Sequence, residues 1–170
     1  MKLRAIGVAI GGAFGVCALA WAQQMGATAT LKPTTGNTAA GTVTFTQKGD
    51  KVAVVANVTG LSPGSHGFHV HEKGDCSAPD GASAGGHFNP AGKAHGDPGA
   101  TDHHAGDMPQ LVADASGKAT LSAELSPMAI GGANDIVGKA VVVHKDADDF
   151  KTQPAGNSGA RIACGVIAKS

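Results

Sequence analysis

Short runs of alternating apolar and polar residues, separated by turns that contain glycine, make up most of this chain. Residues 42–46 (TVTFT) alternate strictly, residues 51–58 are rich in β-branched side chains, and the turn at 48–50 predicts that the two runs form a hairpin. Two further runs, 111–114 and 118–125, predict a second hairpin around a similar turn. Because hardly any stretch of apolar residues spaced three and four apart is long enough to make a helix, we expect helices to be absent or short.

Four more strand candidates bring the expected number to eight; they are residues 27–31, 66–71, 139–144 and 161–168. Two segments without this pattern, 72–107 and 145–160, are rich in polar residues and glycine. Loops of this length in a compact domain are either functional or disordered, and the histidines of the first favour a loop ordered by metal ions. The sequence therefore predicts an all-β fold, an eight-stranded Greek-key β-barrel or sandwich with two long functional loops.

The first 22 residues differ from the rest of the chain. Lys2 and Arg4 give a positive start, an apolar run covers residues 5–20, and Ala-Trp-Ala at 20–22 has the small-x-small form of a signal peptidase site. We interpret residues 1–22 as a removable signal peptide. The remainder, residues 23–170, is expected to form one exported domain.

Two other interpretations of this N-terminal segment are weaker. A membrane anchor needs about 20 apolar residues, whereas this run is shorter and contains several glycines. A lipid anchor on Cys17 lacks the leucine-like residue expected three positions earlier. Removal of the segment leaves Cys76 and Cys164, and two cysteines in an exported chain most simply form one disulfide.

The charge of the exported part argues against polyanionic partners. Loss of residues 1–22 leaves 11 of the 13 basic residues against 13 acidic ones, without a basic cluster. We therefore expect no nucleic-acid partner, and no membrane partner after signal removal.

Histidines are the candidate metal ligands. His69 and His71 stand two residues apart in an expected strand, where alternation places both on one face, and His144 follows the apolar run 141–143. Imidazole suits copper and zinc, and carboxylate suits zinc. The first long loop adds four further candidates: His87, His95, His104 and Asp107. Packing alone does not explain such a cluster.

Six segments, in order, resemble the signature segments of the copper/zinc superoxide dismutase family. They are residues 67–72 (GFHVHE), 86–90 (GHFNP), 93–96 (KAHG), 104–107 (HAGD), 143–149 (VHKDADD) and 159–167 (GARIACGVI). The resemblance covers essentially the whole chain after the signal peptide. It implies that family's β-sandwich architecture.

The resemblance also implies a role for each site residue, with one copper and one zinc per subunit. Copper would be held by His69, His71, His87 and His144, and zinc by His87, His95, His104 and Asp107. His87 would therefore bridge the metals and act in catalysis, and Arg161 would guide the anionic substrate. Asp148 would hydrogen-bond one ligand of each metal. Cys76 and Cys164 match the family disulfide.

The implied activity is the conversion of superoxide into dioxygen and hydrogen peroxide by a copper ion that changes oxidation state, with His87 supplying a proton. The second loop resembles bacterial members, which favours a periplasmic location; such relatives include both homodimers and monomers. One alternative is a protein that buffers copper or zinc without turnover, which has no need of Arg161 or Asp148. Another is a copper-only dismutase, which would lack the zinc ligands.

Two histidines are not expected to bind metal. His66 is interpreted as a hydrogen-bonded structural residue at the entry to the strand that carries His69. His103 is expected to be exposed to solvent, because the spacing to Asp107 favours its neighbour His104 as the ligand.

Overall fold

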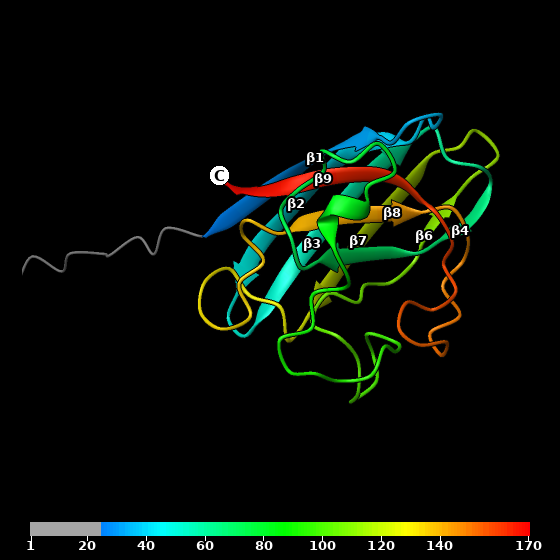
Figure 1. Cartoon of the computed structure of the whole chain (residues 1–170). Coiled ribbons are helices and arrows are strands. Elements are labelled where there is room, and N and C mark those ends of the chain that lie inside the picture. The colour runs from blue at the N-terminus through cyan, green and yellow to red at the C-terminus, as the bar shows by residue number, and fades with distance from the viewer. Residues whose placement is uncertain (1–24) are drawn as a thin grey trace, which may run out of the picture.

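The computed structural model describes residues 25–170, so the predicted signal peptide lies outside the described residues. Within the described part, no helix is long and apolar enough to span a bilayer. Residues 25–170 form one short 3₁₀ helix, Ala82–Ala84, and nine strands. Figure 1 shows how these elements are arranged. The strands are β1 (Gly26–Pro33), β2 (Ala40–Lys48), β3 (Lys51–Thr59), β4 (Gly64–His66), β5 (Phe68–His71), β6 (Leu111–Ala113), β7 (Ala119–Leu125), β8 (Ala140–His144) and β9 (Arg161–Lys169).

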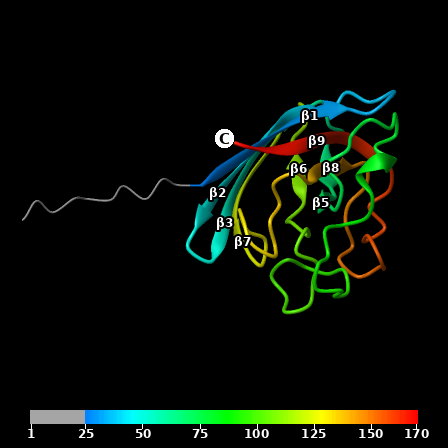
Figure 2. The ribbon, with the colours of Figure 1, turned by 60° about the vertical axis from the view of Figure 1, so that its left-hand side comes forward.

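Seven strands form one curled antiparallel sheet in the order β5-β8-β9-β1-β2-β3-β7, and β4 pairs with β6. The predicted all-β fold is confirmed. The first predicted hairpin also forms, with Lys48 opposite Lys51 at the β2–β3 turn. Figure 2 shows β2, β3 and β7 on one side of the molecule and β5, β8 and β9 on the other.

Two details of the strand prediction are wrong. The strand expected over 66–71 is divided at Gly67 into β4 and β5, which gives nine strands instead of eight. Gly67 leaves the strand to pack tightly, since a Cβ there would lie 2.6 Å from the Cβ of Ser158. The turn of the second predicted hairpin is present, and there the Asp114 amide donates to the Lys118 carbonyl at 2.9 Å. The two strands that flank this turn do not pair with each other, because β6 pairs with β4 and β7 pairs with β3.

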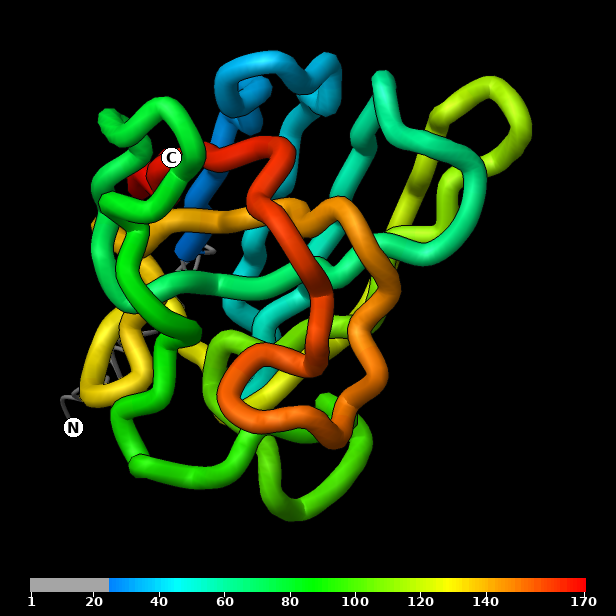
Figure 3. The backbone as a smooth tube through the Cα atoms, turned by 45° about the vertical axis from the view of Figure 1, so that its right-hand side comes forward, coloured from blue at the N-terminus to red at the C-terminus, as the bar shows by residue number. Residues whose placement is uncertain are grey.

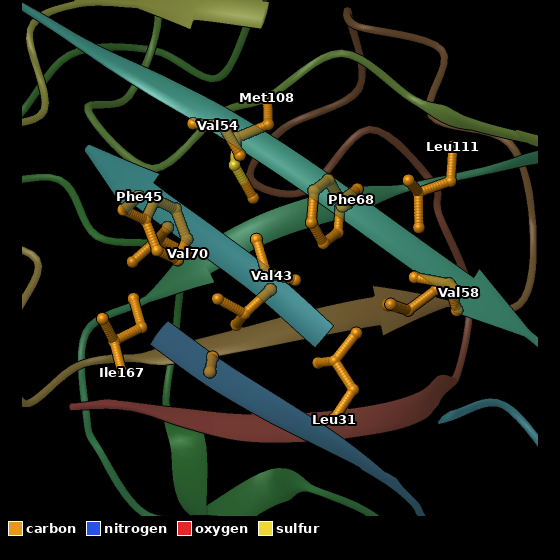
Figure 4. Close-up of a cluster of buried hydrophobic side chains, with 14 of the residues drawn as sticks. Leu31, Val43, Phe45, Val54, Val58, Phe68, Val70, Met108, Leu111 and Ile167 are labelled. Carbon is orange, nitrogen blue, oxygen red and sulfur yellow. The ribbon is translucent and has the colours of Figure 1, made fainter. Parts of the chain in front are cut away.

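The core fills the inside of the curled sheet. In β3 the alternate residues Val52, Val54, Ala56 and Val58 are fully buried, as the sequence pattern predicts. Phe68 and Val70 of β5 point into the same cluster, next to side chains from β1, β2 and β9 (Figure 4). Burial of a large apolar side chain contributes roughly 2 kcal/mol, so this cluster is the main source of stability.

The two long loops lie on the side of β5, β8 and β9, away from β2, β3 and β7 (Figures 2 and 3). The first loop begins after β5 and ends before β6, and the second joins β8 to β9. A disulfide between Cys76 and Cys164, with Cα atoms 5.8 Å apart, ties the first loop to β9 and confirms the predicted pairing.

Candidate metal centre

The first long loop pairs with the free edge of β5 and so delivers its histidines to the strand. The Val70 amide donates to the Gly106 carbonyl at 2.8 Å, and the Phe88 amide donates to the Val70 carbonyl at 2.8 Å. Isolated bridges place His87 opposite His71, and Asp107 opposite His69. Residues far apart in the sequence thereby line one face of β5, while Phe68 and Val70 pack into the core on the other.

Four buried histidines form the first cluster, which we name the four-histidine cluster: His69, His71, His87 and His144. Their ligand atoms all lie within 4.8 Å of one another, and the Nε2 atoms of His71 and His144 are 3.3 Å apart. This set matches the four copper ligands that the resemblance implied.

The outer ring nitrogen of three of these histidines is held by an acceptor. Nδ1 of His71 donates to the Gly85 carbonyl at 2.9 Å, Nδ1 of His144 donates to the Gly159 carbonyl at 3.1 Å, and Nε2 of His69 lies 2.6 Å from Asp148. A proton on each outer nitrogen leaves the inner nitrogen with a free lone pair, which is the arrangement of a metal-ligating histidine.

Two inner nitrogens of the cluster are buried and have no partner in the described structure: Nδ1 of His69 and Nε2 of His87. Buried polar atoms are nearly always paired, so each such atom needs an explanation. A metal ion inside the cluster would satisfy both atoms at once, and the site therefore fits a metal bound by imidazole nitrogens.

The second cluster, named the Asp107 cluster, consists of Asp107 and three histidine Nδ1 atoms. Oδ1 of Asp107 lies 3.0 Å from Nδ1 of His87, 3.1 Å from that of His95 and 3.3 Å from that of His104. The Nδ1 atoms of His87 and His104 are 3.4 Å apart. Four ligand atoms on a tetrahedral zinc ion would be separated by about 3.3 Å, given zinc–nitrogen bonds of about 2.0 Å. The four measured separations, three from Asp107 to a histidine and one between His87 and His104, are close to this value. His69, His87, His95 and Asp107 also offer ligand atoms that all lie within 4.8 Å of one another, so this half of the site can hold a metal ion.

His87 belongs to both clusters through different atoms of one ring. Its Nδ1 faces Asp107 and His104, and its Nε2 faces the inside of the four-histidine cluster. Asp148 also joins the clusters, with Oδ2 2.6 Å from His69 and Oδ1 3.0 Å from Nε2 of His95. The clusters are therefore connected twice, once through the His87 ring and once through a carboxylate.

Burial determines the charge state of the four-histidine cluster. Loss of water, together with the neighbouring histidines, lowers the pKa of His71 to about 2 and that of His144 to about 3. Burial also lowers the pKa of His87 to about 4, although Asp107 opposes that shift. These rings are neutral near pH 7 and can bind a metal ion without first losing a proton.

In the Asp107 cluster, the neighbouring carboxylates raise the pKa of a histidine, whereas burial lowers the histidine pKa values in the four-histidine cluster. Burial alone would lower the pKa of His95, but hydrogen bonds to Asp107 and Asp148 raise it to about 9. Burial likewise opposes ionisation of the two carboxyl groups, but hydrogen bonds from the histidines hold the pKa of each well below its usual range. Without metal, this half of the site carries a proton on His95 between two carboxylates.

Arg161, at the start of β9, is fixed at the mouth of the site. Its guanidinium donates to the carbonyl of Gly81 at 2.7 Å and to that of Gly85 at 2.6 Å. It lines a pocket of about 550 Å³ together with His71, His87 and His144. The remaining lining residues that carry a side chain are neutral or histidine, so Arg161 is the permanent charge of this pocket.

The structure thus brings together every residue that the sequence singled out for the site. His66 is confirmed as structural: it is buried, and its ring nitrogens lie 2.9 Å from the carbonyl oxygens of His144 and Ser62. The expectation for His103 is wrong, because it is buried and its Nδ1 donates to the His104 carbonyl at 2.7 Å.

Two glutamines near the site were missed by the sequence analysis. The side chain of Gln110 accepts a hydrogen bond from the Asp148 amide at 3.1 Å, and that of Gln153 binds the backbone of His95. Neither lies in a pattern that distinguishes it from a solvent-exposed loop residue.

The fold and the paired clusters define the class as an all-β protein with two adjoining sites able to hold metal ions. The model of the copper/zinc superoxide dismutase family matches residues 39–167, and the chain belongs to this family. A solved structure of a protein called the clock protein EA4 is 38% identical, with a TM-score of 0.78. The match covers 94% of this chain and 99% of that one.

Proposed function

We propose that this chain is an exported superoxide dismutase that converts superoxide into dioxygen and hydrogen peroxide in the periplasm. Copper would be held by the four-histidine cluster and zinc by the Asp107 cluster, one ion of each per subunit. The observation that carries the proposal is the His87 ring, whose two nitrogens face two different clusters. The family of the chain and the neutral, buried histidines support it.

When bound, copper supplies one-electron transfer by alternating between its +2 and +1 states, while redox-inert zinc supplies positive charge and a fixed geometry. The net reaction consumes two superoxide anions and two protons and yields one dioxygen and one hydrogen peroxide. The chain's own residues must therefore attract an anion, hold it near the four-histidine cluster, and supply protons.

Arg161 serves the first two tasks. Its position in the pocket beside His71 and His144 places a fixed positive charge where the anion arrives, and a charge focused in a pocket increases the rate of encounter. Because two carbonyls orient the guanidinium, it is preorganised to bind the anion.

His87 serves the third task. Its Nε2 is the buried atom at which the chain can hold a proton whenever that nitrogen is not a ligand, and the residue lines the same pocket as Arg161. Nδ1, held in the Asp107 cluster, keeps the ring in place while the proton moves. Solvent in the pocket supplies the second proton.

The location rests on the N-terminal segment and on the disulfide. Disulfides such as Cys76–Cys164 form and persist in oxidising compartments, of which the periplasm is one. The bond therefore supports export by the predicted signal peptide.

The test measures the decay of superoxide by the mature protein loaded with copper and zinc, and by the same protein loaded with zinc alone. We expect turnover only with copper, and we expect His144→Ala to lose copper and turnover while it keeps its β-sheet circular dichroism. Stoichiometric binding of both metals without turnover would overturn the proposal and favour the metal-buffering protein. Zinc binding at the Asp107 cluster would exclude the copper-only dismutase.

A further inference from the structure

A side chain of the second loop holds the backbone of a residue in the Asp107 cluster. The carboxamide oxygen of Gln153 accepts a hydrogen bond from the His95 amide at 2.8 Å, and its Nε2 donates to the His95 carbonyl at 2.9 Å. The two residues are 58 positions apart, so one amide side chain joins the two long loops. Among the described residues, these are the only hydrogen bonds that the His95 backbone makes.

The ring of His95 is held by one carboxylate from each long loop. Nε2 of His95 lies 3.0 Å from Oδ1 of Asp148, and Nδ1 lies 3.1 Å from Oδ1 of Asp107. Gln153 thus fixes the backbone of His95, Asp148 fixes the outer edge of its ring, and the inner edge faces the Asp107 cluster. His95 itself is buried.

The position of Gln153 separates this role from a role in folding. The residue is exposed, lies in the loop between β8 and β9, and is not part of the hydrophobic core. Its remaining hydrogen bond, to the Lys151 carbonyl at 3.2 Å, is local. Loss of the side chain would leave the backbone groups of His95 without protein partners, and the position of the residue would then rest on the contacts of its ring with Asp148 and Asp107.

We propose that Gln153 is a positioning residue for the zinc half of the site, which sets zinc affinity by fixing the backbone of His95. This inference rests on the proposed function, because it takes the Asp107 cluster to be the zinc site. Residues that orient a metal ligand typically change metal affinity by about 10- to 100-fold when they are replaced.

The test variant is Gln153→Met, which keeps the length of the side chain and removes both hydrogen bonds. Zinc affinity is measured by titration of the metal-free protein against a chromophoric zinc chelator. The matched control is Gln47→Met, because the Gln47 carboxamide also hydrogen-bonds to backbone groups. It donates to the carbonyls of Gly49 and Lys51 at the β2–β3 turn and accepts from the amide of Ile130. Unfolding by denaturant is measured for all three proteins.

We expect Gln153→Met to weaken zinc binding by about 10- to 100-fold, and Gln47→Met to leave zinc affinity unchanged even where it lowers stability. Zinc affinity equal to wild type in Gln153→Met would overturn the inference. An equal loss in both variants would also overturn it, because the effect would then follow general stability. Absence of zinc binding in the wild type is a separate result, and it would overturn the proposed function instead.

Discussion

His71 and Arg161 donate hydrogen bonds to the same carbonyl oxygen, that of Gly85, at 2.9 and 2.6 Å. One backbone atom of the first loop therefore orients both a histidine of the four-histidine cluster and the cation at the mouth of the pocket. The segment that carries Gly85 is tied to β9 by the Cys76–Cys164 disulfide. The position of this loop thus sets the orientation of both side chains, and under the proposed function it would couple the metal cluster to anion binding.

Removal of the disulfide by Cys76→Ser together with Cys164→Ser tests this coupling. We expect a loss of about 2 to 5 kcal/mol in the free energy of unfolding, because the bond closes a loop of 88 residues. We also expect weaker binding of the anion azide to the copper-loaded variant, since Gly85 no longer holds Arg161. Denaturant unfolding and azide titration measure the two effects. Unchanged azide affinity would show that the loop keeps its position without the bond.

Replacement of Arg161 should change the encounter with the anion and leave the metals in place. We expect Arg161→Gln to lower the superoxide rate by about 10-fold or more and to reduce the dependence of the rate on ionic strength. Arg161→Lys is the control, because it keeps the charge but cannot make both carbonyl contacts in the same geometry; an intermediate rate is expected. A full rate in Arg161→Gln would exclude steering by this residue.

Gly156→Ala should disturb the Asp107 cluster. Gly156 has φ +64°, and a Cβ there would lie 2.6 Å from Nε2 of His95 and would collide with Oδ1 of Asp148. We expect zinc affinity and stability to fall together, as judged by chelator competition and denaturant unfolding.

The matched control for this substitution is Gly49→Ala. Gly49 has a similar φ, +61°, but nothing lies within 4 Å of the added methyl group. The control therefore shows the backbone cost alone, roughly 1 to 2 kcal/mol. Equal losses in the two variants would mean that contact with the His95–Asp148 pair is unimportant.

Sequence patterns predicted the parts of this site that depend on local periodicity. Alternation placed His69 and His71 on one face and Phe68 and Val70 on the other, because side chains in a strand point to opposite sides in turn. The turn between β6 and β7 was also predicted, but the two strands do not pair with each other. Instead β6 pairs with β4 and β7 pairs with β3, because tertiary packing decides which strands become neighbours.

Loop residues were harder to predict, because their environment comes from distant contacts. His103 was expected in solvent, yet the first loop turns back so that both His103 and His104 are buried. The role of Gln153 could not be recognised in the sequence, because its partner His95 lies 58 residues away and no repeat or spacing connects the two. The candidate ligands and Asp148 could be predicted, whereas the glutamines that bind the loop backbone around them could not.

The stability of the metal-free protein should be greatest near pH 6.5. The pKa of His71, His144 and His87 in the folded state is about 2, 3 and 4, below the ordinary value of 6.5. Below pH 6.5 the unfolded chain therefore binds more protons than the folded chain, and acid lowers stability by up to about 1.4 kcal/mol per pH unit for each histidine.

Above pH 6.5, the titration of His95 determines how the stability of the metal-free protein changes with pH. Its pKa of about 9 lies above the ordinary value, so the proton between Asp107 and Asp148 stabilises the folded state fully below pH 6.5, and this contribution is lost as the pH rises towards 9. Denaturant unfolding of the metal-free protein across this range, with a chelator present, measures both slopes. Zinc is the control: bound by the Asp107 cluster as proposed, it would take the place of the proton on Nδ1 of His95, and the alkaline slope should then disappear. An alkaline slope that persists with zinc bound would assign the proton to another group.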